Sequence, residues 1–130
     1  MRWSEEFATG IASIDEQHRM IFRMTGDFRI ALDEGEGEQV YDDLLRSLDL
    51  YIRTHFRIEE ECMARFQCAA AEQNKVAHAR FAKILANLRE RYAVSGFKRS
   101  DARELIDLLE QWLANHICRI DVQLKGARIP

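Results

Sequence analysis

The hydrophobic positions of the chain recur in alternating steps of three and four residues over four separate stretches. In an α-helix this spacing places the apolar side chains on one face. We therefore predict four helices, near residues 13–34, 38–66, 71–94 and 101–120, with glycine or capping residues between them. Because the connections are short, consecutive helices should run antiparallel. The predicted fold is all-α, an up-down-up-down four-helix bundle.

The length of the chain fits one domain. Its 130 residues can bury a core without disulfide bonds, so we treat residues 1–130 as a single domain. Residues 1–12 are predicted to be a non-helical lead-in. Ser13 and Asp101 are each followed three residues later by glutamate, which predicts capping boxes at the start of the first and fourth helices.

Charge and composition exclude several classes of protein. The net charge of −3 gives no basic surface for nucleic acid. No apolar run approaches the roughly 20 residues that a membrane span needs, and the N-terminus has no apolar stretch typical of a signal peptide. The three cysteines are an odd number without CxxC spacing, which favours a reducing compartment. We therefore expect a cytoplasmic protein.

The four histidines of the chain lie on the apolar stripes, one on each predicted helix. His18 and His78 lie near the starts of their helices, whereas His55 and His116 lie near the ends. Because antiparallel helices bring starts and ends to the same level, the four imidazoles should converge at one end of the bundle. A single core histidine is more often a hydrogen-bonded neutral side chain, but four on four stripes favour a shared site.

Two carboxylates accompany the histidines. Glu59 lies four residues after His55 on the same helical face, where an unpaired carboxylate would be costly. Asp121 lies five residues after His116, about 140° away on an ideal helix, and reaches the site only if the helix loosens or ends there. Imidazoles and carboxylates inside a helical bundle suit a non-haem metal centre. These ligands alone would accept iron, manganese or zinc.

The neighbouring polar residues have structural interpretations. Glu60 and Glu61 continue an acidic run and are expected to be solvated. Cys62, on the stripe one turn beyond Glu59, is interpreted as a buried small hydrophobe, and Cys68 lies in the turn before the third helix. No general base, nucleophile or phosphate-binding loop stands out, so no enzymatic substrate is indicated.

Four motifs of the chain, in order and at similar intervals, resemble those of the bacterial hemerythrin family. They are Gly10-Ile11-x-x-Ile14-Asp15-x-x-His18, His55-Phe56-x-x-Glu59-Glu60-x-x-Met63, His78-x-x-Phe81 and Trp112-Leu113-x-x-His116-Ile117-x-x-x-Asp121. The resemblance covers nearly the whole chain. It implies a di-iron centre that binds O2 or other small diatomic or anionic ligands.

The resemblance also implies a ligand set for each of the two iron ions, with an oxo or hydroxo bridge between them. One iron takes His18 and His55 and keeps an open position for O2. The other iron takes His78 and His116.

Four further residues take roles from the same resemblance. Glu59 and Asp121 would bridge the two irons. Leu113 and Ile117 would line an apolar pocket for oxygen. The five-residue step to Asp121 is part of the family motif.

One position departs from the family pattern. The third helix has Asn74-x-x-x-His78 where the family has His-x-x-x-His, so an amide stands in the place of the fifth histidine. An amide oxygen is a harder and weaker donor than imidazole. We therefore expect Asn74 to be a weak ligand of the second iron, or to leave that ligand position vacant.

A metal site with a weak or vacant ligand position suits an oxygen sensor better than an oxygen-storage protein. We therefore expect a domain that binds O2, senses oxygen or redox state and regulates a signalling output domain. Members of the family also occur as input domains joined to outputs such as diguanylate cyclases. The chain is expected to be either the N-terminal sensor domain of such a protein or a free-standing protein.

Three alternatives stay open at this point. One is a free-standing oxygen carrier or store, and another is a metal-free structural bundle. The third is an enzyme that uses the same metals, although we expect no enzymatic activity from these 130 residues themselves. A longer parent chain could carry diguanylate cyclase activity.

Overall fold

Long helices make up most of the chain in the computed structural model, which describes residues 3–65 and 67–117. Two of the four helical stretches are unbroken α-helices, α1 (Ala12–Asp33) and α4 (Ala71–Ser95). Their apolar stripes, free of proline, explain their length. Gly35, with φ 77°, and Gly96, with φ 74°, form the turns that follow them, in a backbone region that glycine adopts easily.

The other two stretches each contain a wide π-helical segment. The second stretch passes from α2 (Gly37–Tyr51) through η2 (Ile52–Phe56) into α3 (Arg57–Arg65). The fourth stretch passes from α5 (Arg99–Gln111) into η3 (Trp112–Ile117). A π-helical turn holds one more residue than an α-helical turn and is frequent at functional sites.

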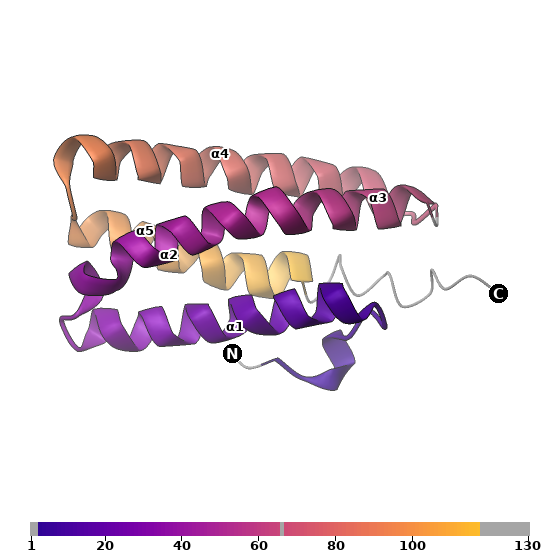
Figure 1. Cartoon of the computed structure of the whole chain (residues 1–130), viewed down its shortest axis with the longest axis horizontal. Helices are drawn as coiled ribbons and strands as arrows, with labels where there is room; N and C mark the ends of the chain where they lie inside the picture. The colour runs from indigo at the N-terminus through magenta and orange to yellow at the C-terminus, as the bar shows by residue number, and fades with distance from the viewer. Residues whose placement is uncertain (1–2, 66, 118–130) are drawn as a thin grey trace.

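The connections alternate between the two ends of the bundle (Figure 1). The α1–α2 and α4–α5 connections lie at one end, and the α3–α4 connection lies at the other, beside the start of α1. α1 packs against α2 and α5, and α4 packs against α3 and α5. The predicted all-α, up-down-up-down four-helix bundle is therefore confirmed.

The predicted capping box at the start of α1 is wrong. α1 begins at Ala12, one residue before Ser13, and has no side-chain cap. Instead, the carboxylate of Asp15 accepts hydrogen bonds from the backbone N–H groups of Thr9 (2.7 Å) and Gly10 (3.1 Å). It also accepts one from the Thr9 hydroxyl (2.8 Å). An acidic side chain in the first turn therefore fixes the chain that enters the helix.

The second predicted capping box is wrong for a similar reason. α5 begins at Arg99, two residues before Asp101. The Asp101 carboxylate accepts a 3.0 Å hydrogen bond from the guanidinium of Arg91 in α4, and Glu104 accepts another from the same group. Both acidic residues of the predicted box therefore join α5 to α4 instead of capping α5.

The lead-in before α1 contains a short helical turn, unlike the prediction. Glu5–Phe7 form one turn of 3₁₀-helix, η1. Phe7 stacks on Phe22 of α1 with ring centroids 6.0 Å apart, and the guanidinium of Arg19 lies 4.2 Å from the ring centre of Trp3. The lead-in therefore packs along α1.

The bundle interior is apolar along most of its length. Its buried side chains come from all four helical stretches and include Phe28, Leu48, Leu85, Leu88, Leu105 and Leu109. Buried polar side chains interrupt this core toward the end where α1 begins, among them the four histidines, Glu59 and Asn74. None of the described helices combines the length and the apolar character that a membrane-spanning segment needs.

Candidate metal centre

Four histidines and one glutamate meet inside the bundle. His18 comes from α1, His55 from η2, His78 from α4 and His116 from η3, and Glu59 comes from α3. None of these five residues is more than 2% exposed. Each helical stretch therefore contributes one imidazole to the same interior space, which the antiparallel arrangement of the helices makes possible.

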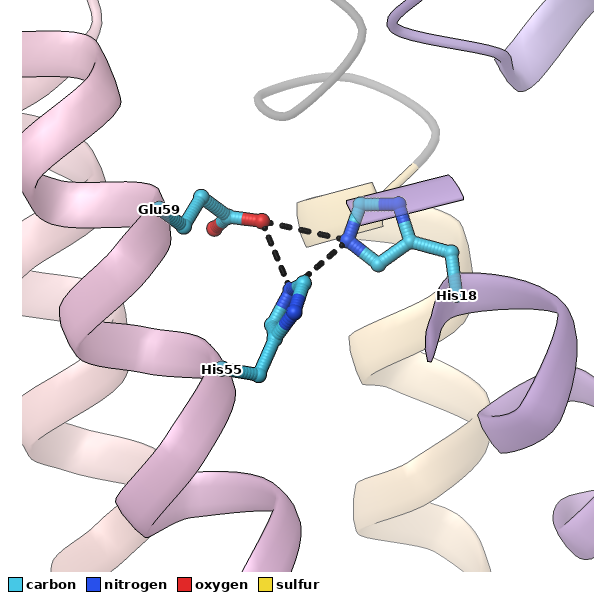
Figure 2. A group of neighbouring side chains, drawn as sticks. All are labelled: His18, His55 and Glu59. Carbon is cyan, nitrogen blue, oxygen red and sulfur yellow. Dashed lines mark hydrogen bonds and ion pairs between the residues drawn. The ribbon is translucent and has the colours of Figure 1, made fainter. Parts of the chain in front are cut away.

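The two carboxylate oxygens of Glu59 divide the histidines into two pairs. Oε2 lies 3.1 Å from Nε2 of His18 and 2.9 Å from Nε2 of His55 (Figure 2). Oε1 lies 2.9 Å from Nε2 of His78 and 3.5 Å from Nε2 of His116. Each oxygen thus faces its own pair of nitrogens, which is the arrangement of a carboxylate that bridges two metal ions.

The spacing of these donor atoms fits metal ligands. The Nε2 atoms of His18 and His55 are 3.1 Å apart, and those of His78 and His116 are 3.2 Å apart. For bonds of about 2.1 Å, adjacent ligands lie about 3.0 Å apart in an octahedral site and about 3.4 Å apart in a tetrahedral one. The separations among His18, His55 and Glu59, 2.9–3.1 Å, are close to the octahedral value. Those among Glu59, His78 and His116 range from 2.9 to 3.5 Å and cover both values. Each group of three donors therefore has a spacing that could hold one metal ion.

The outer nitrogens of two imidazoles are hydrogen-bonded. Nδ1 of His78 donates to Oε2 of Glu60 at 3.1 Å, and Nδ1 of His55 donates to Oε1 of Gln17. Carboxylate and amide oxygens only accept hydrogen bonds, so in these contacts the proton lies on Nδ1. The inner nitrogen, Nε2, donates to Glu59 when it carries a proton, and a metal ion that replaces this proton binds the Nε2 lone pair.

Neither of these two supporting residues is expected from the sequence pattern. Contrary to the expectation that it is solvated, Glu60 is half-buried, because its carboxylate contacts His78 while its side chain stays 29% exposed. Gln17 had no predicted role. Each residue is next to a candidate ligand in sequence, and therefore lies about 100° away from it around the helix, off the apolar stripe. The only sequence signal for Glu60 and Gln17 is that they are next to Glu59 and His18. Hydrophobic periodicity identifies buried stripe positions and does not identify such neighbours.

Aromatic rings pack against three of the imidazoles. Phe56 stacks on His78 with centroids 3.8 Å apart, Trp112 on His116 at 3.8 Å and Tyr51 on His55 at 4.8 Å. The interplanar angles are 5°, 16° and 14° respectively. These stacks hold the imidazole planes in place and surround the donor atoms with apolar surface.

Glu59 is ionised in this environment. Burial alone would raise the pKa of its carboxyl, but the hydrogen bonds of the four surrounding histidines outweigh burial and hold the pKa well below its usual range. A buried carboxylate is costly unless positive charge compensates it. The site therefore favours cations, either protons on the imidazoles or bound metal ions.

The remaining predicted site residues fall into two groups. Asn74 is fully buried on α4, one turn before His78 and on the same helical face, and Leu113 is buried in η3. Asp121 and the side chain of Ile117 lie outside the part of the chain that the structure describes. Within residues 3–65 and 67–117, the groups of three that could hold a metal ion are His18 with His55 and Glu59, and Glu59 with His78 and His116.

Comparisons with known proteins place the chain among hemerythrin-like proteins. The family described as "Hemerythrin HHE cation binding domain" matches residues 9–127. A bacteriohemerythrin of Stenotrophomonas maltophilia is 33% identical over 115 residues, which cover 88% of this chain and 72% of the relative. A bacteriohemerythrin of Methylococcus capsulatus is 25% identical over 93% of this chain and 91% of its own length. A myohemerythrin of Theromyzon tessulatum is 26% identical over 96% and 91% respectively. No solved structure matches the chain.

The family match covers most of the chain and agrees with its helical bundle. Hemerythrin domains bind a di-iron centre and O2, and the proteins of this family are oxygen-binding proteins rather than enzymes. The two groups of His and Glu side chains could hold such ions. These 130 residues therefore belong to the hemerythrin family.

Proposed function

We propose that this domain holds two iron ions, binds O2 and acts as a sensor of oxygen or redox state. The observation that supports this proposal is Asn74. This residue is fully buried on the face of α4 that carries His78, where the family motif has a second histidine. An amide at this position makes the two halves of the site chemically unequal.

Each iron has its own histidines in this proposal. His18 and His55 hold the first iron, His78 and His116 hold the second, and Glu59 provides one oxygen to each. The contacts of 2.9–3.5 Å between the Glu59 oxygens and the four Nε2 atoms support this assignment.

Asp121 is proposed as a second bridging carboxylate. It follows His116 by five residues, a spacing that an ordinary α-helix does not place on one face. His116 lies in the π-helical segment η3, and π-helical hydrogen bonds join residues five apart. The five-residue spacing requires a widened turn between His116 and Asp121, beyond the described residues, and the assignment rests on the family motif.

The iron pair, when bound, supplies a reversible redox centre with an open position for a small ligand. The residues around it control access to that position. Leu113, 1% exposed, is proposed to line an apolar oxygen pocket together with Ile117. Phe56 and Trp112 stack on the imidazoles of the second pair and exclude water from that side.

Asn74 favours a sensor for a physical reason. An amide oxygen binds iron more weakly than an imidazole nitrogen does, so the second iron should exchange ligands and change oxidation state more readily. A sensor needs a site that responds to its surroundings, whereas a carrier needs an oxygen complex that resists oxidation. We propose that η3 and α5 transmit the change to a signalling domain, such as a diguanylate cyclase, in a cytoplasmic parent protein.

The substitution Asn74→His tests the proposal. It should raise iron affinity, slow the oxidation of the oxygenated protein in air and weaken the binding of added azide. Asn87→His is the matched control, because Asn87 lies on the same helix and is exposed. If Asn74→His leaves all three quantities at their wild-type values, the proposed role of Asn74 is wrong.

A free-standing oxygen carrier is the second candidate function. The match to a myohemerythrin over 91% of that protein's length favours it. The lifetime of the oxygenated form in air separates the two functions. A carrier should keep its oxygenated form as long as the Asn74→His variant does, whereas a sensor should lose it sooner.

A further inference from the structure

Two cysteines lie at the end of α3 that faces the α3–α4 connection. Cys62 belongs to the last two turns of α3, and Cys68 follows the helix. Both thiols are free and only partly buried, so Cys62 packs as a small hydrophobe, as expected, but is less buried than expected. Both side chains pack against the same small cluster of Ile14, Met63 and Ala70.

The backbone at the end of α3 folds back so that these two cysteines approach each other. The N–H of Cys68 donates to the carbonyl of Met63 at 2.9 Å, and the N–H of Gln67 donates to the carbonyl of Ala64 at 3.2 Å. Gln67 has φ 53°, in the left-handed region. These three features define a Schellman motif, in which the residue after the left-handed one contacts the third or fourth residue from the helix end. Cys68 and Cys62 occupy these contacting positions.

The electrostatics of the thiols also indicate that they are close. Burial raises the pKa of the Cys68 thiol, and charge on Cys62 raises it further. Burial and the nearby Glu59 carboxylate raise the pKa of the Cys62 thiol. Both groups are therefore mainly protonated at neutral pH, and the pair should stay reduced until an oxidant reaches it.

We propose that Cys62 and Cys68 form a reversible disulfide in response to peroxide, which makes the C-terminal cap of α3 a redox modification site. One thiol releases its proton, the resulting thiolate attacks a peroxide oxygen, and the O–O bond breaks to give a sulfenic acid and hydroxide, which takes up the released proton to form water. The second thiol releases its proton and attacks the sulfenic sulfur, so that the S–S bond forms and the leaving hydroxide takes up that proton as a second water. The two thiols lose two electrons and two protons, and hydrogen peroxide is reduced to two water molecules.

The position of this pair gives the disulfide a structural consequence. Cys62 lies one turn after Glu59 on α3, and Cys68 lies three residues before the start of α4, the helix that carries Asn74. The bond would join the end of one ligand-bearing helix to the entry of the next. Its formation does not depend on bound metal, so it can be tested separately from the proposed iron site.

Trypsin provides a direct test because Arg65 lies between the two cysteines. The third cysteine, Cys118, is first replaced by serine so that only Cys62 and Cys68 can react. The metal-free protein is treated with hydrogen peroxide, its remaining thiols are alkylated, and it is then digested. The disulfide should hold peptides 58–65 and 66–75 together as one species, about 2 mass units lighter than the sum of the two thiol peptides. Dithiothreitol should separate the two peptides.

The controls are Cys62→Ser and Cys68→Ser, each added to the Cys118→Ser protein and checked for unchanged helical circular dichroism. Neither should give the linked species. Three results would overturn the proposal: both cysteines alkylated after peroxide treatment, both oxidised separately to sulfinic or sulfonic acids, or linked peptides only from covalent dimers on a non-reducing gel.

Discussion

Nδ1 of His78 lies 3.1 Å from Oε2 of Glu60, so a carboxylate outside the ligand cluster supports one of its imidazoles. The corresponding atom of His55 faces the amide oxygen of Gln17. An ionised acceptor makes the stronger hydrogen bond and raises the basicity of the imidazole more than a neutral amide does. The two histidine pairs therefore differ in the acceptors that hydrogen-bond their outer nitrogens. They also differ because Asn74 lies one turn before His78 on α4.

The first prediction concerns Glu60→Gln. This change keeps a hydrogen-bond acceptor but removes the charge beside His78, so the iron affinity of the weaker site should fall by about 10- to 100-fold. A competition titration with a chelator measures the affinity. Glu61→Gln is the control, because Glu61 is exposed and pairs with Arg57 at 3.3 Å. Equal effects of the two substitutions would show that Glu60 acts only through surface charge.

The second prediction distinguishes Glu59, which is proposed to bind both metal ions, from His18, which is proposed to bind only one. His18→Ala removes a donor from one pair and should reduce the metal content from two ions to one. Glu59→Ala removes an oxygen from both pairs and should weaken both ions. Metal analysis of samples dialysed against a limiting chelator measures the two outcomes. Retention of two tightly bound ions by Glu59→Ala would contradict a bridging role.

The third prediction concerns the proposed oxygen pocket. Leu113 and Leu109 lie one turn apart and are both almost fully buried. Either Leu→Ala change should lower the free energy of unfolding by about 2–5 kcal/mol through lost burial and a cavity. Leu113→Ala alone should also speed the oxidation of the oxygenated protein, since it admits water to the site. Stopped-flow spectroscopy and urea unfolding measure the two effects, and equal oxidation rates in both variants would refute the pocket assignment.

The fourth prediction concerns alkaline pH. Burial, together with the nearby Asp101 carboxylate, raises the pKa of Tyr41 from 10.0 to about 12. The folded state therefore holds the phenol proton more tightly than the unfolded state does. This contribution to stability is complete below pH 10 and is lost as the pH rises from about 10 to 12. Urea unfolding across this range should show a smaller loss of stability in Tyr41→Phe than in the wild type, whereas parallel profiles would contradict the shift.

The positions that meet in the site could be anticipated from the sequence, because hydrophobic periodicity reports burial. His18, His55, His78 and Glu59 all lie on apolar stripes, and the antiparallel order of the helices determines that they share one end. The same reasoning could not anticipate η2 and η3. No residue type in these segments distinguishes a π-helical turn from an α-helical one, and both segments carry a histidine of the site.

The local errors have a common physical cause. Asp101 and Glu104 match the sequence pattern of a helix cap, but a tertiary partner, Arg91, takes their hydrogen bonds. Glu60 matches a solvated acidic run, but its carboxylate contacts a tertiary partner, His78, and the residue is half-buried. Polar side chains form hydrogen bonds within one helix and between helices. A sequence pattern predicts only the contacts within one helix.

Metal content and the optical spectrum of one sample, first reduced without oxygen and then exposed to air, test the proposed di-iron site most directly. We predict two irons per chain and a visible charge-transfer band that appears on exposure. The lifetime of that band then measures how readily the oxygenated form oxidises. Absence of both iron and the band after reconstitution with excess Fe(II) would contradict the proposal and show that the bundle with Asn74 does not hold a di-iron centre.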